Sequence, residues 1–167
     1  LLFLFFGFGA LLASHAMRKV KTATVSESPR LGLIFSFLFV LVAVAVVSVL
    51  FITGGRYAGE VAFAKAVNLD NSGGEITEIV TKLDKAASYN RYNDIYYRNL
   101  AQALLLRVST EIQGVGAEMS AEESSMIQAL TAASINSAKR CTDLGPNNVL
   151  NWRIRGAIYR EVIALIG

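Results

Sequence analysis

The chain has 167 residues, of which 53% are hydrophobic and 17% are charged, and its formal net charge is +3. The basic excess is confined to residues 1–56, which carry a net charge of +4, whereas residues 57–167 carry −1, so we expect no nucleic-acid partner. The single cysteine, Cys141, excludes an internal disulfide and a zinc knuckle.

Residues 1–56 have the composition of a membrane region. An apolar stretch over 1–14 is followed, rather than preceded, by basic residues, which favours a transmembrane helix over the alternative of a signal peptide. Residues 31–53 form a run of 23 without a charge, long enough to cross a bilayer as a helix. Because the chain begins within one apolar stretch and ends within a helical pattern, we expect a fragment of a longer protein.

The segment between the two predicted spans, residues 15–30, predicts their orientation. Its basic residues are Arg18, Lys19, Lys21 and Arg30. Short basic loops stay on the cytoplasmic side of a membrane. We therefore expect an integral protein of the cytoplasmic membrane, in contact with membrane lipid, with residues 57–167 on the outer side. Gly54 and Gly55 are expected to end the second span.

Residues 57–167 have helical periodicity throughout, which predicts an all-α fold. A short helix is expected over Tyr57–Asn68, before a turn-rich segment. Ser120 and Glu123 form a capping box that opens a long helix, and Gly145 with Pro146 ends it.

Two further helix starts are predicted from asparagine caps. Asn93 or Asp94 caps a helix that extends to about residue 113, and Asn147 or Asn148 caps the last helix. The residues expected on apolar faces of the four later helices are Ile76, Ile79, Val80, Leu83 and Ala87; Ile95, Leu100, Ala103 and Leu104; Ile127, Leu130, Ser134, Ala138 and Cys141; and Val149, Trp152, Ile154, Ala157 and Ile158.

An internal repeat is predicted because residues 85–107 align with residues 139–161 at an offset of 54. The paired positions are Lys85 with Lys139, Asn93 with Asn147, Ile95 with Val149, Leu100 with Ile154, Ala103 with Ala157 and Leu104 with Ile158. Helix pairs that recur in this way stack into solenoids, because one pair cannot bury its apolar face alone.

This repeat resembles tetratricopeptide (TPR) repeats, with Pro146, Ala103 and Ala157 at the most typical positions. Its period is longer than the roughly 34 residues of that family, and we expect the extra length in the two helices around residues 114–120. The resemblance implies a TPR-like α-solenoid of antiparallel helix pairs over residues 57–167, which follows the two transmembrane helices predicted from the apolar runs. It also implies a surface for a protein or peptide partner.

The order of segments is similar to the C-terminal part of bacterial O-antigen ligase-like multi-span membrane proteins that end in a TPR tail. The segments that carry this resemblance are GGRYAGEVAFAKAV, KLDKAASYNRYNDIYYRNLAQALLLR and NWRIRGAIYREVIALIG. In that family, glycan transfer from a lipid carrier is assigned to a large external loop between earlier membrane helices. The resemblance therefore supplies no catalytic residue within residues 1–167.

The sequence predicts no catalytic, cofactor-binding or metal-binding residues. Glu122 and Glu123 are adjacent, so they point in different directions on a helix, and Glu123 is explained as part of the cap. Cys141 lies on an apolar stripe, where a free cysteine packs as a small hydrophobic residue.

One cluster is predicted as a possible partner contact: Tyr92, Tyr97, Arg91 and Arg98. Tyrosine and arginine are favoured in protein contact surfaces. The alternative is that aromatic residues here, Tyr96 and Tyr92 among them, only pack between helices.

Three functions are compatible with these features. The first is a non-catalytic, membrane-anchored interaction module that binds a protein, a peptide or its own copies. The second is the tail of an O-antigen ligase-like or polymerase-like glycan transferase whose active site lies upstream. The third is a structural subunit of a surface assembly. Whether the whole protein is an enzyme is left open.

Overall fold

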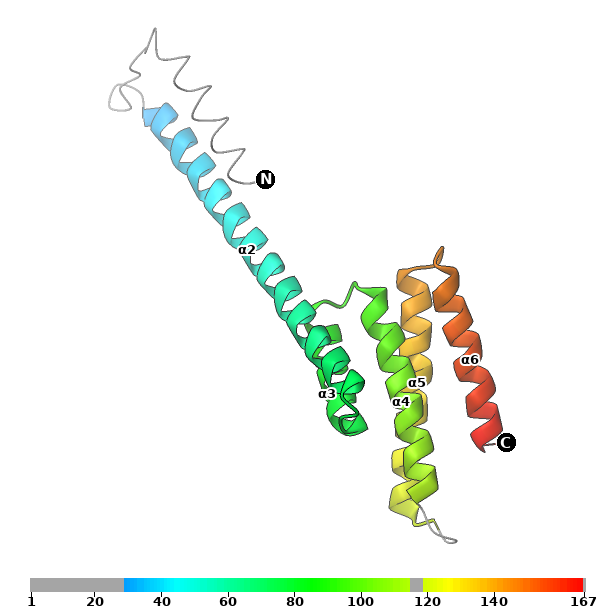
Figure 1. Cartoon of the computed structure of the whole chain (residues 1–167). Helices are drawn as coiled ribbons and strands as arrows, with labels where there is room; N and C mark the ends of the chain where they lie inside the picture. The colour runs from blue at the N-terminus through cyan, green and yellow to red at the C-terminus, as the bar shows by residue number, and fades with distance from the viewer. Residues whose placement is uncertain (1–28, 115–118, 167) are drawn as a thin grey trace. The chain divides into compact units, whose positions relative to one another are not determined.

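The computed structural model describes residues 29–114 and 119–166, and these residues form helices joined by short turns, with no strand (Figure 1). The helices are α2 (Pro29–Asn71), α3 (Ile76–Tyr89), α4 (Asp94–Gly114), α5 (Ala121–Leu144) and α6 (Val149–Ile166). The prediction of an all-helical chain is confirmed for this part. The predicted span over residues 1–14 and most of the predicted loop over 15–30 lie outside the described residues.

The chain divides into two compact units, Leu1–Ser48 and Val49–Gly167. The division falls within the apolar run, before the predicted domain boundary at residue 56. The second unit contains the last turns of that run, the rest of α2 and all of the later helices. The candidate sites described below lie entirely within this second unit.

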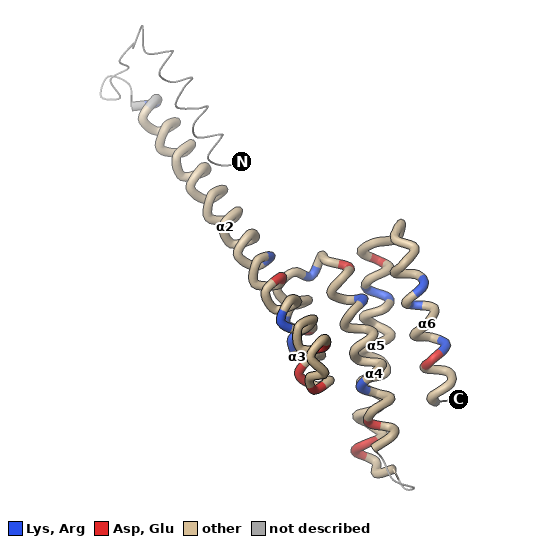
Figure 2. The backbone as a smooth tube through the Cα atoms, viewed as in Figure 1, with Lys and Arg blue, Asp and Glu red and all other residues tan. Residues whose placement is uncertain are grey.

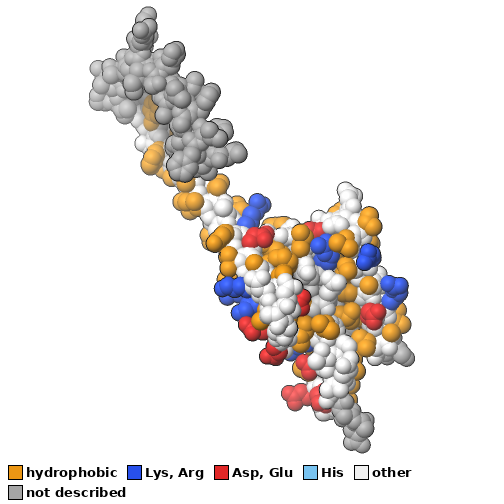
Figure 3. Space-filling view, viewed as in Figure 1, with side chains coloured by type: hydrophobic (Ala, Val, Ile, Leu, Met, Phe, Trp, Pro, Cys, Tyr) orange, Lys and Arg blue, Asp and Glu red, His pale blue; other side chains and the backbone are white. Residues whose placement is uncertain are grey.

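Helix α2 contains one segment, Gly32–Asn71, that is long and apolar enough to cross a membrane by length and composition, with a mean hydropathy of 3.1 over its most apolar window. That window is not buried by other parts of the described chain, and nearly all of its exposed side chains are hydrophobic, some of which are visible in Figure 3. Among the described residues it is the one such segment. The predicted span over 31–53 therefore has a helix of suitable length.

The prediction that Gly54 and Gly55 end this helix is wrong, because α2 continues through both glycines to Asn71. Two adjacent glycines disfavour a helix by roughly 1 kcal/mol each. Packing of the following segment compensates for that penalty. A Cβ on Gly55 would lie 3.4 Å from the carbonyl oxygen of Tyr89, so this face of α2 lies close to the end of α3. The expected short helix over Tyr57–Asn68 is thus the last part of α2.

The core of the second unit forms where the small-residue face of α2 meets α3 and α4. Ala62 and Ala66 of α2 are buried with Leu83 of α3 and Leu100 of α4. A second buried cluster joins the later helices through Ala101, Ala138 and Ile158. Consecutive helices run antiparallel, and α6 contacts α4 as well as α5 (Figure 1). Contact between α4 and α6 is the arrangement expected of stacked helix pairs.

The two turns at one end of these helices have the same geometry, but at an offset of 55 rather than the predicted 54. Helix α3 ends at Tyr89 and α5 at Leu144, and the next helices begin at Asp94 and Val149, each pair 55 residues apart. The residues after the helix ends have similar backbone angles, φ −135° and ψ 83° at Asn90 and φ −127° and ψ 66° at Gly145. The predicted alignment is therefore wrong by one residue.

The caps establish this register. The side-chain oxygen of Asn93 accepts a hydrogen bond from the amide of Ile95 at 3.1 Å, and that of Asn148 accepts one from the amide of Leu150 at 3.1 Å. Asn148, not Asn147, is thus the counterpart of Asn93. The predicted capping box at Ser120 and Glu123 is confirmed, with both of its reciprocal hydrogen bonds present.

Most residues predicted to face inward are buried or half-buried, whereas three are exposed. Ile95, Val149 and Trp152 were predicted on apolar faces, yet Val149 is 79% exposed and Trp152 is 51% exposed. All three lie in the first turn or so of α4 or α6, directly after the caps.

Candidate functional site

The four residues of the predicted partner contact do not form one surface. Arg91 and Tyr92 lie in the turn between α3 and α4 and are exposed, Tyr92 by 76%. Tyr97 is half-buried on α4, and the guanidinium carbon of Arg140 on α5 lies 6.0 Å from the centre of its ring. The fourth residue, Arg98, is half-buried and points to a different part of the molecule.

Arg91 and Tyr97 line a shallow depression of about 320 Å³ together with Arg140. Ala87, Ser88 and Asp84 of α3 complete its lining. Neither Tyr92 nor Arg98 borders this depression. The structure therefore brings two of the four predicted residues together and separates the other two from them.

Arg98 belongs to a polar cluster between α4, α5 and α6 that has Asn151 at its centre. The side chain of Asn151 is completely buried. Its amide Nδ2 donates to Asp94 Oδ2 at 2.7 Å and to the carbonyl oxygens of Cys141 and Gly145 at 2.9 and 3.2 Å. Its Oδ1 accepts from Arg98 Nη1 at 3.3 Å. Burial of this amide is favourable because its donor and acceptor groups are both satisfied.

Asp94 connects this cluster to the cap of α6. Its Oδ2 also accepts a hydrogen bond from Asn148 Nδ2 at 3.2 Å. The Asn151 amide is the main reason that the pKa of Asp94 lies below its ordinary value, and the Asn148 amide and the charge of Arg98 lower that pKa further against the effect of burial. The Asp94 side chain is therefore ionised, and in this form it holds the start of α6 beside the start of α4.

Arg155 extends the polar contacts along α6. Its Nη1 donates to Thr142 Oγ1 of α5 at 2.9 Å, and its guanidinium carbon lies 5.5 and 5.4 Å from the ring centres of Trp152 and Tyr159. Stacking on aromatic rings and a buried hydroxyl partner both suit a planar guanidinium. Trp152 is itself held at the turn, where its Nε1 donates to the carbonyl oxygen of Pro146 at 2.8 Å.

After the turn between α3 and α4, the position that corresponds to Asn151 at the 55-residue offset is Tyr96. Its side chain is buried, with 1% exposure. Its ring lies 5.0 Å from that of Phe63, centre to centre, and a Cβ on Gly59 would be 3.4 Å from its Cε2 atom. Burial, with a smaller contribution from the nearby Glu60 carboxylate, raises the pKa of Tyr96 to about 12. The expectation that Tyr96 packs between helices is confirmed, whereas Tyr92 does not pack in this way.

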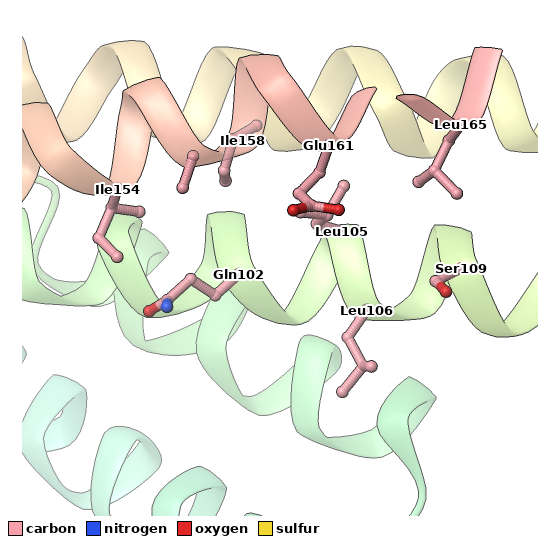
Figure 4. A pocket seen from close by; sticks show the side chains of 9 residues that line it. Gln102, Leu105, Leu106, Ser109, Ile154, Ile158, Glu161 and Leu165 are labelled. Atoms are coloured by element: carbon pink, nitrogen blue, oxygen red, sulfur yellow. The ribbon is translucent and has the colours of Figure 1, made fainter. Parts of the chain in front are cut away.

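An apolar groove of about 310 Å³ lies between α4 and α6 (Figure 4). Ile158 is buried at its base, and Leu106 and Glu161 are exposed beside it. The complete lining is Gln102, Leu105, Leu106, Ser109, Ile154, Ala157, Ile158, Glu161 and Leu165. This volume is at the low end of the range for small-molecule pockets, about 300–1,000 Å³.

A second groove of about 200 Å³ continues on the other side of α4, between α4, α3 and α2. Gln102 and Leu106 line both grooves. The two depressions therefore adjoin each other on a face that includes residues of α2, α4 and α6. Sequence reasoning missed this surface. The alternation of polar and apolar residues along α4 could have indicated the part of the surface that α4 contributes. The part contributed by α6 could be predicted only with the correct register between the two repeats.

The described residues hold no group of three or more histidine, cysteine, aspartate or glutamate side chains placed to bind a metal ion. Cys141 packs as a small hydrophobic residue, as predicted: it is completely buried, and its thiol donates to the carbonyl oxygen of Ala138 at 3.1 Å. Burial raises the pKa of that thiol, which makes it a poor nucleophile.

Comparison of the chain with protein-family models, with curated proteins and with solved structures gives no match. The resemblance to O-antigen ligase-like proteins with a TPR tail accordingly stays a prediction that rests on the sequence segments quoted above.

Proposed function

We propose that the chain is a membrane-anchored, extracytoplasmic helical-repeat module that binds a segment of a partner protein along the face of α2, α4 and α6. The observation that carries this proposal is the apolar groove between α4 and α6, which adjoins the groove beside α2 because Gln102 and Leu106 line both. Stacked helix pairs commonly bind partners on such an extended face.

The membrane anchor in this proposal is the apolar part of α2. Residues 31–53 carry no charge, and a helix of that length matches a hydrocarbon core of about 30 Å. The extracytoplasmic side follows from the basic residues that precede this run. Helix α2 then continues directly into the unit that carries the groove.

The lining of the groove favours a partner segment with apolar side chains on one face. Six of its lining residues are aliphatic, and Gln102 and Ser109 add polar groups. The exposed carboxylate of Glu161 favours a lysine or arginine in the partner. An amphipathic helix laid along the groove satisfies these requirements, because one face supplies the apolar contacts and the rim of the groove meets its polar side.

A photo-crosslinking amino acid at position 106 tests this proposal in the native membrane of the source cell. We expect a discrete crosslinked product from Leu106, which is exposed and borders both grooves. The matched control is the same amino acid at Ala132, which is exposed on α5 and lines neither groove. A product of twice the mass of the chain identifies a second copy as the partner.

A variant in which the groove is filled tests whether the crosslink depends on this groove. Ala157→Trp fills the groove between α4 and α6 and should abolish the product formed from position 106. Circular dichroism of the variant checks that its helices are retained. Equal products from positions 106 and 132, or none from either position, would contradict the proposed binding face.

A further inference from the structure

The second unit, Val49–Gly167, has one end that differs in charge and exposure from the other. This end, called the basic end below, consists of the turns Asn90–Asn93 and Gly145–Asn148 and the halves of the helices nearest to them. The hydrogen bonds from Asn148 and Asn151 to Asp94 hold these two turns at the same end of the helices (Figure 1). The basic end can therefore contact one surface with both turns.

The basic end lies beside the point where the apolar run of α2 finishes. The run ends at Thr53, and Gly55 and Gly59 follow it about 3 and 9 Å farther along the helix axis. A Cβ on Gly55 would be 3.4 Å from the Tyr89 carbonyl oxygen, and a Cβ on Gly59 would be 3.4 Å from the Cβ of Asn90. The end of α3 and the turn after it are thus level with these two glycines.

That level corresponds to the lipid headgroups. A bilayer is about 40–45 Å thick and its hydrocarbon core about 30 Å, which leaves a headgroup layer of roughly 5–8 Å on each side. If the uncharged run up to Thr53 fills the hydrocarbon core, the turn beside Gly55 and Gly59 lies within or just outside this layer.

The charged residues are distributed unevenly between the two ends of the unit (Figure 2). In the described chain after Thr53, the basic end has eight basic and four acidic residues, a net charge of +4, whereas the opposite end has four basic and seven acidic residues, a net charge of −3. The basic residues at the basic end are Arg56, Lys85, Arg91, Arg98, Lys139, Arg140, Arg153 and Arg155. Lipid phosphates have the complementary charge.

Exposed aromatic side chains follow the same division. Among the described residues after Thr53, the exposed aromatic residues are Tyr57, Tyr89, Tyr92 and Trp152, and all four lie at the basic end. Tyrosine and tryptophan are enriched at membrane interfaces, because an apolar ring with one polar group suits the headgroup layer. Val149 and Leu150, also exposed, lie in the same end of α6.

We propose that the basic end rests on the headgroups of the bilayer that α2 crosses, with Tyr92 and Trp152 as its interfacial side chains. This inference depends on the membrane anchoring proposed above. It also gives a role to Tyr92, which does not border the depression that Arg91 and Tyr97 line, and to Arg91 beside it in the same turn. The groove along α2, α4 and α6 is then left for a protein partner.

Fluorescence quenching in lipid vesicles tests the inference, because Trp152 is the single tryptophan of the chain. The full chain is reconstituted in phosphatidylcholine and phosphatidylglycerol vesicles whose acyl chains are brominated close to the glycerol backbone. Three reporters are built in a Trp152→Phe background: Phe51→Trp in the apolar run, Tyr92→Trp at the basic end, and Ile163→Trp at the far end of α6. Ile163 is 70% exposed and serves as the control.

The inference predicts quenching of the reporters at positions 51, 92 and 152 and none at position 163. Quenching at 51 without quenching at 92 and 152 would overturn the inference but keep the anchor, and would leave Arg91 and Tyr92 free for a protein partner. Absence of quenching at 51 would overturn both proposals. Quenching at 163 equal to that at 152 would also overturn the inference, because the unit would then have no preferred end.

A charge reversal tests the electrostatic part of the inference. Arg153 and Arg160 are both exposed on α6, the first at the basic end and the second beyond it. Arg153→Glu should reduce the quenching of Trp152 in these anionic vesicles, whereas Arg160→Glu should leave it unchanged. Equal effects of the two variants would overturn the assignment of the basic end as the lipid-facing surface.

Discussion

Asn151 of α6 donates a hydrogen bond to Asp94 of α4 across 2.7 Å, and this contact joins two helices that are not consecutive in the chain. The same amide group of Asn151 also donates to the carbonyl oxygens of Cys141 and Gly145 at the end of α5. One buried side chain therefore fixes three helices relative to one another. Both the groove and the basic end depend on the position of α6 that results.

Replacement of Asn151 by alanine should destabilise the second unit by about 1–3 kcal/mol, because it leaves the Asp94 carboxylate and two carbonyl oxygens without this partner. Thermal unfolding followed by circular dichroism measures the effect. Asn147→Ala, at an exposed position in the same turn, is the matched control and should change stability by less than about 0.5 kcal/mol. Equal unfolding temperatures for the two variants would contradict the role of Asn151.

The contribution of Asp94 should depend on pH. Its pKa is lower in the folded chain than the ordinary value of 3.8, so the ionised form favours folding. This stabilisation is complete above pH 3.8 and is lost as the pH falls through the lower pKa of the folded state. The difference in unfolding temperature between the parent and Asp94→Asn should therefore be largest near neutral pH and disappear in strong acid. A difference that grows on acidification would show the opposite sign of linkage.

Two glycines provide a test of packing around this cluster. A Cβ on Gly145 would lie 2.6 Å from Asn151 Nδ2 and 2.8 Å from Asp94 Oδ2, whereas a Cβ on Gly156 would meet no atom within 4 Å. Gly145→Ala should destabilise the unit by about 1–3 kcal/mol, as overpacking does. Gly156→Ala should stabilise it by about 0.5–1 kcal/mol through helix propensity. Thermal unfolding that ranks the two variants in the reverse order would refute this packing.

The contact between α2 and the turn after α3 depends on small residues. Gly59 is buried. A Cβ there would lie 3.4 Å from each of three atoms, the Ala86 carbonyl oxygen, the Cβ of Asn90 and Cε2 of Tyr96. Gly59→Leu should therefore destabilise the second unit by about 1–3 kcal/mol. Gly54→Leu is the matched control on the same helix, since a Cβ at Gly54 meets nothing within 4 Å. Limited proteolysis of the α3–α4 turn should be faster in the first variant alone.

Local signals in the sequence were sufficient for most of the helices. The capping box at Ser120, the cap at Asn93 and the stop at Gly145 each depend on residues within one turn of the chain. The continuation of α2 through Gly54 and Gly55 could not be predicted in this way. It depends on contacts of Gly55 and Gly59 with residues about thirty positions later, which outweigh the low helix propensity of glycine.

The candidate sites were less accessible from the sequence for a related reason. Adjacent asparagines at 147 and 148 gave two possible registers for the repeat, and hydrogen bonding shows that Asn148 is the cap. A buried Asn151 has no sequence signature, because its burial is favourable only where Asp94 and the end of α5 surround it. Arg98 was grouped with Tyr97 by proximity in sequence, although adjacent helical residues point in different directions.

The central claim is that α2 crosses the membrane and leaves the helical unit on the outer side. It is tested most directly by labelling Ile163→Cys, in a Cys141→Ala background, with a membrane-impermeant maleimide. Position 163 is 70% exposed, whereas the native Cys141 is completely buried, so the unmodified chain is the unlabelled control. We predict labelling of position 163 in intact cells. Labelling that occurs only after the cells are permeabilised would contradict the proposed orientation.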